Sequence, residues 1–307
     1  VTICLGSKGA KQYPDTIILL INLCLAVVSV GCLIQFFPGA RDEIVCFHDG
    51  TILRQQPKSG QHLCTFTFFL IYYFLIAAIV WFVFLSYALY IQFRRTGSAK
   101  DIFKKKATLF HICAWCIPGF FTSVVLAMKE VDGDSMSGIC FVGFANTTSR
   151  IWFLLIPIGL AALISGFFLI SLRLPLISSQ VLYTLLKMKG QELANEKSRK
   201  KLHRMIRKIS LFSIFAAILI ICTFACHAYD FIYRKVWMES LRDYIVCQAM
   251  NSAQPSSEFS VPMCSLKSRP NISVMYIHLS CVFAFGVLMS SWAWTKTSLN
   301  VWKRFFR

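Results

Sequence analysis

The chain alternates between long apolar runs and shorter polar stretches. Six runs are long enough to cross a membrane and are almost free of charged side chains. They are Thr16–Phe37, Cys64–Phe93, Ala107–Met128, Ile151–Leu172, Ile209–Tyr233 and Ile272–Trp294. A bilayer core about 30 Å thick takes roughly 20 apolar residues of α-helix to cross, so each run predicts one membrane span.

Helices are the only candidate for these spans. Backbone polar groups in lipid must be bonded internally, and no run alternates like a barrel strand. The predicted fold is therefore all-α, a transmembrane helical bundle. The second run has 30 residues, so it must tilt or project beyond the lipid. Composition agrees, because 56% hydrophobic and 15% charged residues leave too few polar groups to cover a soluble globule.

Basic residues set the expected orientation. Cytosolic loops of membrane proteins are enriched in Lys and Arg. Four segments hold 22 of the 32 Lys and Arg residues and are assigned to the cytosol: Lys8 to Lys11, Arg94–Lys106, Arg173–Lys208 and the tail from Lys296. The net charge of +18 is dispersed over these segments, which favours orientation and attraction to anionic lipid over binding of nucleic acid.

The loops assigned to the outside carry two further signals. The only N-x-S/T sequons, at Asn146 and Asn271, fall there and predict glycosylation, although Asn271 lies close to the membrane. Of 13 cysteines, five lie in or beside outside loops, where disulfides persist: Cys46, Cys64, Cys140, Cys247 and Cys264. Because five is odd, one of them needs a partner elsewhere, stays reduced or bonds another chain.

The first residues are interpreted as the end of a further helix. Val1–Leu5 is apolar and leads directly into a basic loop. Three regions follow from this interpretation: the end of a first span with its cytosolic loop (1–13), spans two to seven of seven (14–294), and the start of a cytosolic helix (295–307). A true six-span protein with both ends in the cytosol is the alternative. No internal repeat of the kind common in transporters and no pore-like ring of carboxylates is found.

Several stretches carry a family resemblance. They are Gly39–Cys46 (GARDEIVC), Val131–Gly143 (VDGDSMSGICFVG) and the ending from Trp294 to Trp302. Together they resemble the Frizzled/Smoothened family of seven-helix receptors, and the similarity runs from about Tyr13 to the last residue. The resemblance implies a receptor, not an enzyme. The family also has an extracellular cysteine-rich domain, a linker and a first helix that this sequence does not contain.

Finer features favour the Smoothened branch of that family. They are Cys226–Phe231 (CHAYDF), Arg242–Tyr244 (RDY) before Cys247, and a Trp-Thr-Lys-Thr ending in place of the Ser-Gly-Lys-Thr of Frizzled receptors. The basic middle loop and the stretch Ala249–Pro262 match poorly, which indicates a divergent, invertebrate form.

The resemblance implies how the outside cysteines pair. Cys64 would bond Cys140 and tie the second outside loop across the bundle as a lid. Cys247 would bond Cys264, and the family partner of Cys46 lies in the missing linker. Spacing alone does not give these pairs, and purely structural bridges are the simpler interpretation.

The resemblance also implies a ligand cavity that accepts sterols such as cholesterol. Its expected lining residues are Asp134, Met136, Ser137, Phe144, Arg150, His227, Tyr229, Asp230, Met275 and His278. A carboxylate within a span is costly, so Asp230 is expected to face the bundle, with Arg150 as a possible partner. An Asp230 already at the water interface is the alternative. Met275 stands where the family usually has Glu, and His278 where it has Asn, so the hydrogen-bonding set of the cavity differs.

Two features are expected at the cytosolic face. Lys208 begins the fifth run, which is the sixth span of seven, and Trp294 closes the last run, so a cation above an indole ring could clamp the two helices together. The resemblance makes this contact an activation switch, whereas snorkelling by Lys208 and an interfacial Trp belt is the ordinary interpretation. The spacing of apolar and basic residues over Thr295–Arg307 predicts an amphipathic helix on the inner leaflet. The Lys187–Lys208 segment is a candidate docking surface for a cytosolic transducer, a G protein or a kinase, or a surface that contacts lipid.

The function that the resemblance implies is transduction of a Hedgehog signal by a sterol-responsive receptor in the plasma or ciliary membrane, regulated indirectly by Patched. A Frizzled-type Wnt receptor and a sterol transporter or channel without effector coupling are the alternatives. Catalysis and metal binding are not expected. His111 lies near Cys113 and Cys116, and His227 near Cys222 and Cys226, but helical spacing puts several of these on different faces.

Overall fold

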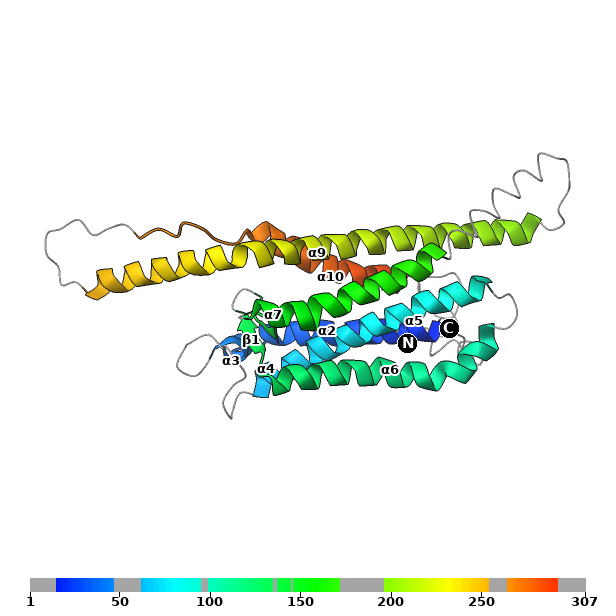
Figure 1. The fold of residues 1–307 in the computed structure, drawn as a ribbon, viewed down its shortest axis with the longest axis horizontal. Coiled ribbons are helices and arrows are strands. Elements are labelled where there is room, and N and C mark those ends of the chain that lie inside the picture. Colours follow the sequence, from blue (N-terminus) through cyan, green and yellow to red (C-terminus); the bar gives the residue numbers. More distant parts are fainter. Residues whose placement is uncertain are drawn as a thin grey trace, which may run out of the picture. The chain divides into compact units, whose positions relative to one another are not determined.

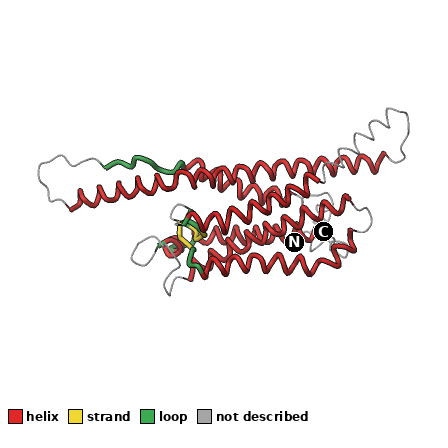
Figure 2. The backbone as a smooth tube through the Cα atoms, viewed as in Figure 1, coloured by secondary structure: helices red, strands yellow, loops and turns green. Residues whose placement is uncertain are grey.

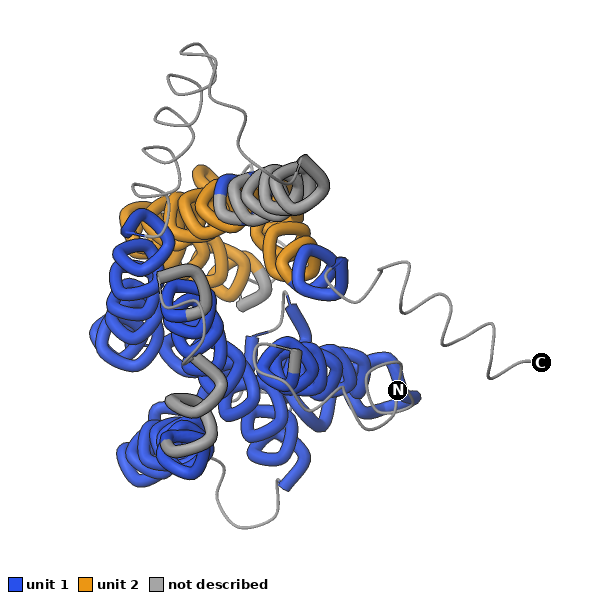
Figure 3. Tube along the Cα trace, turned by 90° about the vertical axis from the view of Figure 1, so that its right-hand side faces the viewer, with its two compact units in different colours: residues 1–214, 286–307 blue, residues 215–285 orange. Residues whose placement is uncertain are grey.

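A computed structural model describes residues 15–46, 62–94, 99–134, 137–144, 146–171, 196–253 and 264–291 (Figure 1). Helices dominate these residues, and the strands form only one short hairpin (Figure 2). Regions 1–13 and 295–307 of the expected organisation lie outside the described residues. Two compact units are distinguished, one built from residues 1–214 and 286–307 and the other from residues 215–285 (Figure 3).

The described helices contain six segments that are long and apolar enough to span a membrane. They are Thr16–Phe36, His62–Ile91, Lys106–Ala127, Thr147–Ser171, Ile214–Asn251 and Ile272–Ser290. Each overlaps one of the six apolar runs of the sequence, so the all-α membrane bundle is confirmed. The hairpin is an addition that the apolar pattern did not predict.

The elements follow one another in this order. Numbered in the order of the described helices, the first span is α2 (Asp15–Leu33) with η2 (Ile34–Phe36), followed by the short helix α3 (Ala40–Val45). The second is a continuous helix of α4 (His62–Phe68), the π-helical turn η3 (Phe69–Tyr73) and α5 (Phe74–Arg94). Then come α6 (Ala99–Ala127), the strands β1 (Val131–Asp134) and β2 (Ile139–Val142), α7 (Thr147–Arg150) with the π-helical turn η4 (Ile151–Leu155), α9 (Glu196–Ala253) and α10 (Ile272–Ser290).

Two helices are longer than the apolar runs predicted. The fifth run ends at Tyr233, but α9 continues to Ala253 and has 58 residues, about 87 Å of helix at ~1.5 Å per residue. Its sequence contains no Gly or Pro, so nothing interrupts the backbone hydrogen bonds where the lipid ends. Helix α6 begins at Ala99, inside a stretch that was assigned to a loop, and residues 99–106 likewise contain no Gly or Pro.

The core of the first unit is formed by α2, α5 and α6. Helix α5 packs along both α2 and α6. The side chains of Phe68, Tyr72 and Trp81 are fully buried along the second span, and Ile17 and Ile21 of α2 are equally buried. Close packing of these large groups fixes the helices that carry the external hairpin.

The second unit is an antiparallel pair made by α9 and α10 with the segment before α10. Its contacts form a ladder in which residue numbers rise along one helix and fall along the other. The rungs are the His227–His278 ring contact, the Ser268 N–H to Ser240 Oγ hydrogen bond of 2.9 Å, and the Cys247–Cys264 disulfide. These contacts hold the C-terminal part of α9 against α10 and the segment before it.

Candidate ligand site and external cap

The external cap is a two-stranded hairpin packed on the end of the second span. Strand β1 pairs antiparallel with β2 in the register Val131 to Val142 and Asp134 to Ile139. A disulfide joins Cys64 to Cys140, residues that are 76 apart in the chain. This is the pairing that the family resemblance implied, and it ties the hairpin directly to α4.

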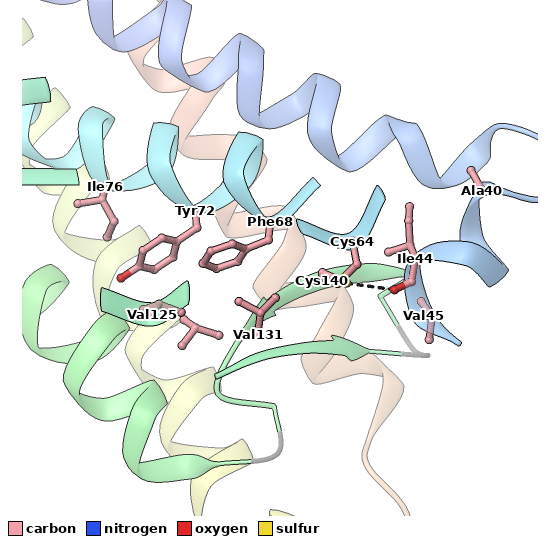
Figure 4. Packing of buried hydrophobic residues seen from close by; sticks show 11 residues of the cluster. Ala40, Ile44, Val45, Cys64, Phe68, Tyr72, Ile76, Val125, Val131 and Cys140 are labelled. Carbon is pink, nitrogen blue, oxygen red and sulfur yellow. Dashed lines mark hydrogen bonds between the residues drawn. A yellow bond between two sulfur atoms is a disulfide. The ribbon is translucent and has the colours of Figure 1, made fainter. Parts of the chain in front are cut away.

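Apolar side chains surround that disulfide (Figure 4). Ile44 and Val45 of α3, Phe68 and Tyr72 of the second span, Val125 of α6, and Val131 and Val142 of the hairpin are all buried there. The Cys140 sulfur lies 3.1 Å from the carbonyl oxygen of Ile44. A disulfide sulfur has no proton to donate, so this is a close sulfur–oxygen contact that fixes the end of α3 against the bridge.

Two glycines allow the cap to pack this tightly. A Cβ on Gly133 would lie 3.0 Å from the carbonyl oxygen of Val45, so a larger residue would force β1 and the end of α3 slightly apart. Gly143 has φ +80°, and a Cβ there would lie 2.7 Å from the Cα of Arg150. Gly143 thereby places the chain against the start of the fourth span.

The predicted lid residues Asp134 and Ser137 are brought together in the hairpin turn. The Asp134 carboxylate accepts hydrogen bonds from the Ser137 backbone N–H at 3.0 Å and from its hydroxyl at 2.7 Å. These bonds close the turn locally, as short polar side chains commonly do. Met136 lies outside the described residues. The ring of Phe144 lies 6.4 Å from that of Phe141, so this aromatic side chain is held at the cap.

Both sequon asparagines cap helices that enter the membrane. The side-chain oxygen of Asn146 accepts from the Thr148 N–H at 3.1 Å at the start of α7, and its amide donates to Glu130. Asn271 accepts from the Ser273 N–H at 2.9 Å at the start of α10. Each asparagine is exposed and satisfies a backbone donor that a helix N-terminus leaves without a partner, which gives it a structural role apart from glycosylation.

Two tyrosines on the π-helical turn of the second span bond to neighbouring helices, a feature that the sequence analysis missed. The Tyr72 hydroxyl donates to the Phe153 carbonyl of η4 at 2.7 Å, and the Tyr73 hydroxyl donates to the Trp115 carbonyl of α6 at 3.2 Å. A π-helical turn inserts one extra residue and disturbs the regular backbone bonding, as does Pro118 within α6. Each tyrosine therefore bonds a carbonyl beside an irregular turn of its neighbour.

Three polar side-chain atoms buried in the first unit have no hydrogen-bond partner among the described residues: Trp81 Nε1, Thr122 Oγ1 and Ser165 Oγ. The Trp81 ring is fully buried and lies 5.0 Å from that of His111 in an edge-to-face contact. Buried donors in this state are the groups that a bound water or a ligand hydroxyl satisfies. Trp81 is thus a candidate ligand contact, which the sequence analysis did not identify because Trp81 lies within an apolar run.

In the second unit, Asp230 forms an ion pair. Its carboxylate lies 3.7 Å from Nε of Arg234, one turn further along α9, and the two side chains are 26% and 21% exposed. The pair reduces the cost of a carboxylate within the span. The sequence analysis had named Arg150 as a possible partner; Arg150 belongs to the other unit, where it ends α7.

Aromatic and imidazole rings accompany this pair. Tyr229 stacks obliquely on Tyr233 at 5.0 Å and lies 5.4 Å from Trp237. His227 is buried, and its ring meets that of His278 at 4.6 Å between centroids. Met275 lies one turn before His278 on α10 and is half-buried. The His278 that replaces the usual Asn of the family thus makes a direct ring contact.

The Cys247–Cys264 disulfide is present at the far end of the second unit, again as the resemblance implied. Cys46 lies outside both disulfides. The Lys208 side chain and the whole of Trp294, the expected activation switch, lie outside the residues whose side chains are described. Among the described residues no group of three or more His, Cys, Asp and Glu side chains is arranged to hold a metal ion.

These features define a class of protein: an integral membrane protein of apolar helices with a disulfide-tied hairpin at one end of its second span. The chain matches the Frizzled/Smoothened family membrane region over residues 1–307 and belongs to that family, whose membrane region is a seven-helix bundle. The described residues contain six of its spans.

Similarity to individual proteins separates the two branches of the family. The chain is 38% identical over 298 residues to Protein smoothened of Gallus gallus and 36% identical over 301 residues to Protein smoothened of Drosophila melanogaster, which covers 97% and 98% of this chain. It is 25% identical over 297 residues, 96% of the chain, to Frizzled-10-B of Xenopus laevis. The matched regions make up 37%, 28% and 48% of those proteins, so the chain spans less than half of each relative.

Proposed function

We propose that this chain is the membrane core of a Smoothened-type receptor that passes a Hedgehog signal to cytosolic effectors. The observation that carries the proposal is the identity of 36% to 38% with smoothened proteins over nearly the whole chain, against 25% with a Frizzled. The proposed location is the plasma membrane, including its ciliary part. Catalysis is no part of the proposal.

The proposed ligand is a sterol. A sterol is a largely apolar molecule with one hydroxyl, so a binding site for it needs apolar lining side chains and few polar groups. His227 and Asp230 supply such groups within an apolar helix, and the buried Trp81 N–H supplies another within the first unit. Asp134, Ser137, Phe144 and Arg150 are proposed to act as cap and wall residues around ligand entry.

At the inner face, the basic first turns of α9 are proposed as the surface for a cytosolic transducer, a G protein or a kinase, in contact with anionic lipid. These turns carry several Lys and Arg residues between Glu196 and Lys208. Regulation by Patched would then be indirect, through the supply of sterol. The sequons at Asn146 and Asn271 are proposed glycosylation sites.

The proposal is tested by rescue. The full-length receptor is expressed in cells that lack their own Smoothened, and Hedgehog and Wnt reporters are both read. Restored Hedgehog output without a Wnt response is expected; a Wnt response alone would assign the chain to the Frizzled type. A photoreactive sterol should label the purified receptor, and labelling should fall in Asp230→Ala. Labelling without output from either reporter would favour a sterol transporter or channel.

A further inference from the structure

The two disulfides lie in different surroundings. Cys64 and Cys140 are both 0% exposed, and buried apolar side chains surround their bridge. Cys247 and Cys264 are each only half-buried. Thiol–disulfide exchange requires that an attacking thiolate reach one of the two sulfur atoms directly. Of these two bridges, the Cys247–Cys264 bridge is therefore the one that a dissolved thiol can reach.

The polar atoms next to the two bridges also differ. Nδ2 of Asn251, one turn of α9 beyond Cys247, donates a hydrogen bond to the Cys264 sulfur at 3.2 Å. The Cys140 sulfur instead lies 3.1 Å from the carbonyl oxygen of Ile44. A donor stabilises the negative charge that a sulfur gains when the bridge breaks, whereas a carbonyl oxygen opposes that charge. The Cys264 sulfur is therefore the better leaving group.

The Cys247–Cys264 bridge lies beyond the apolar part of α9. The apolar run ends at Tyr233, and Cys247 lies 14 residues further along the helix, about 21 Å at ~1.5 Å per residue. The distribution of Lys and Arg assigns this end of α9 to the outside of the cell, where disulfides persist. A thiol dissolved in the outer solution can therefore approach the bridge without entering the bilayer.

We propose that the Cys247–Cys264 bridge is a site of thiol–disulfide exchange with an extracellular dithiol of the thioredoxin class. One thiolate of the dithiol attacks the Cys247 sulfur, the bond to Cys264 breaks, and Cys264 leaves as a thiolate that Asn251 stabilises. The second thiol of the reductant then attacks the mixed disulfide and releases Cys247. The dithiol is oxidised to a disulfide, and its two electrons and two protons convert the bridge into two thiols.

The exchange removes one rung of the ladder in the second unit. The two other rungs, the Ser240–Ser268 hydrogen bond and the His227–His278 ring contact, lie nearer the middle of α9. Reduction therefore loosens the last turns of α9 and leaves its inner part paired. The site does not depend on the proposed signalling function, because it rests on a bridge and a side chain of one unit.

The test uses the full receptor in lipid nanodiscs, with its free thiols first blocked by N-ethylmaleimide. Reduced thioredoxin is added, the thiols that appear are labelled with iodoacetamide, and the labelled peptides are mapped by mass spectrometry over time. Because the buried bridge must first open, label should appear at the Cys247–Cys264 bridge at least about 10-fold faster than at the Cys64–Cys140 bridge. A thioredoxin variant that lacks its second cysteine should be trapped as a mixed disulfide on Cys247.

The role of the amide donor is tested by Asn251→Ala. The net worth of one hydrogen bond corresponds to about 2- to 10-fold in rate, so the variant should be reduced more slowly by that factor. Gln248→Ala is the matched control. Gln248 is exposed one turn earlier on α9 and donates to the Tyr244 hydroxyl, so this variant should be reduced at the wild-type rate.

Three results would overturn the proposal. The first is reduction of the Cys247–Cys264 bridge no faster than that of the Cys64–Cys140 bridge. The second is trapping of the thioredoxin variant on Cys264. The third is an unchanged or faster reduction in Asn251→Ala. The first two are measured on the wild type, so they decide the proposal even where a variant fails to fold.

Discussion

At the scale of single residues, the backbone hydrogen bonding of the second span explains the roles of two buried or half-buried tyrosines. Tyr72 and Tyr73 are adjacent on one π-helical turn, and each donates to a carbonyl of a different neighbouring helix. No apolar pattern could predict this, because a π-helical turn is defined by backbone bonding. The sequence shows two tyrosines in an apolar run, and only the structure shows the carbonyl oxygens that accept their hydrogen bonds.

Replacement of Tyr72 by Phe should therefore destabilise the protein. A buried acceptor left without its donor costs about 1 to 3 kcal/mol, and the Tyr72 side chain is fully buried. The measurement is thermal unfolding of the purified receptor in detergent. Tyr73→Phe is the matched control: its bond is longer, at 3.2 Å, and its side chain is less buried, so its loss should be smaller. Equal effects of the two variants would contradict this account.

Replacement of Gly143 is also expected to destabilise the protein. In Gly143→Ala the new Cβ meets the Arg150 backbone and the residue keeps a φ of +80°, so the free energy of unfolding should fall by about 2 kcal/mol or more. Gly166→Ala in the fourth span meets nothing within 4 Å and should raise stability by about 0.5 to 1 kcal/mol. The two variants, compared in one thermal assay, should move in opposite directions.

At the scale of elements, the two disulfides differ in how much chain they close. Cys64–Cys140 spans 76 residues and holds the cap to the bundle, whereas Cys247–Cys264 spans 17 residues beside α9. Both pairs were implied by family resemblance, and cysteine counting alone left the connectivity open. The hairpin that carries Cys140 was not predicted, because its two four-residue strands are too short for an alternating pattern to reveal them.

The longer bridge should contribute more to stability. Loop-closure entropy gives roughly 4.5 kcal/mol for the larger loop and roughly 3 kcal/mol for the smaller one. The double variant Cys64→Ser with Cys140→Ser should therefore unfold at a lower temperature than Cys247→Ser with Cys264→Ser. Surface expression and thermal unfolding of both double variants are measured side by side. A larger loss from the smaller loop would show that native contacts outweigh chain entropy.

The outer half of α9 is expected to be helical in the membrane protein. Spin labels at Lys235 and Met250, both exposed, should lie about 22 Å apart along a helix of ~1.5 Å per residue. Pulsed electron resonance measures this distance in nanodiscs. An extended chain of that length would give up to about 50 Å. A broad distribution centred on long distances would restore the loop that the apolar pattern indicated after Tyr233.

At the scale of the whole molecule, most of the fold could be predicted from charge and hydropathy. The number of spans follows from run length, and the expected orientation from the Lys and Arg asymmetry. The candidate ligand site could not be predicted from charge and hydropathy. His227, Asp230 and His278 were named by resemblance, but Arg234 as the partner of Asp230 could not be read from the sequence, since i to i+4 neighbours are common on any helix.

The proposed switch between Lys208 and Trp294 belongs to this scale. A contact of about 0.5 to 2 kcal/mol between a cation and an indole is enough to bias two states of a receptor without locking either one. Trp294→Leu should therefore raise ligand-independent Hedgehog output in a reporter cell line. Trp302→Leu, further along the same ending, is the matched control. Unchanged basal output in Trp294→Leu would count against the switch.

The unbroken α9 has one mechanical consequence. A helix of 58 residues without Gly or Pro behaves as a stiff rod, so a tilt of about 5° around its midpoint displaces each end by about 4 Å in opposite directions. No hinge absorbs that movement along the way. We therefore expect a displacement of one end of α9 to be passed along the helix rather than taken up at a break within it.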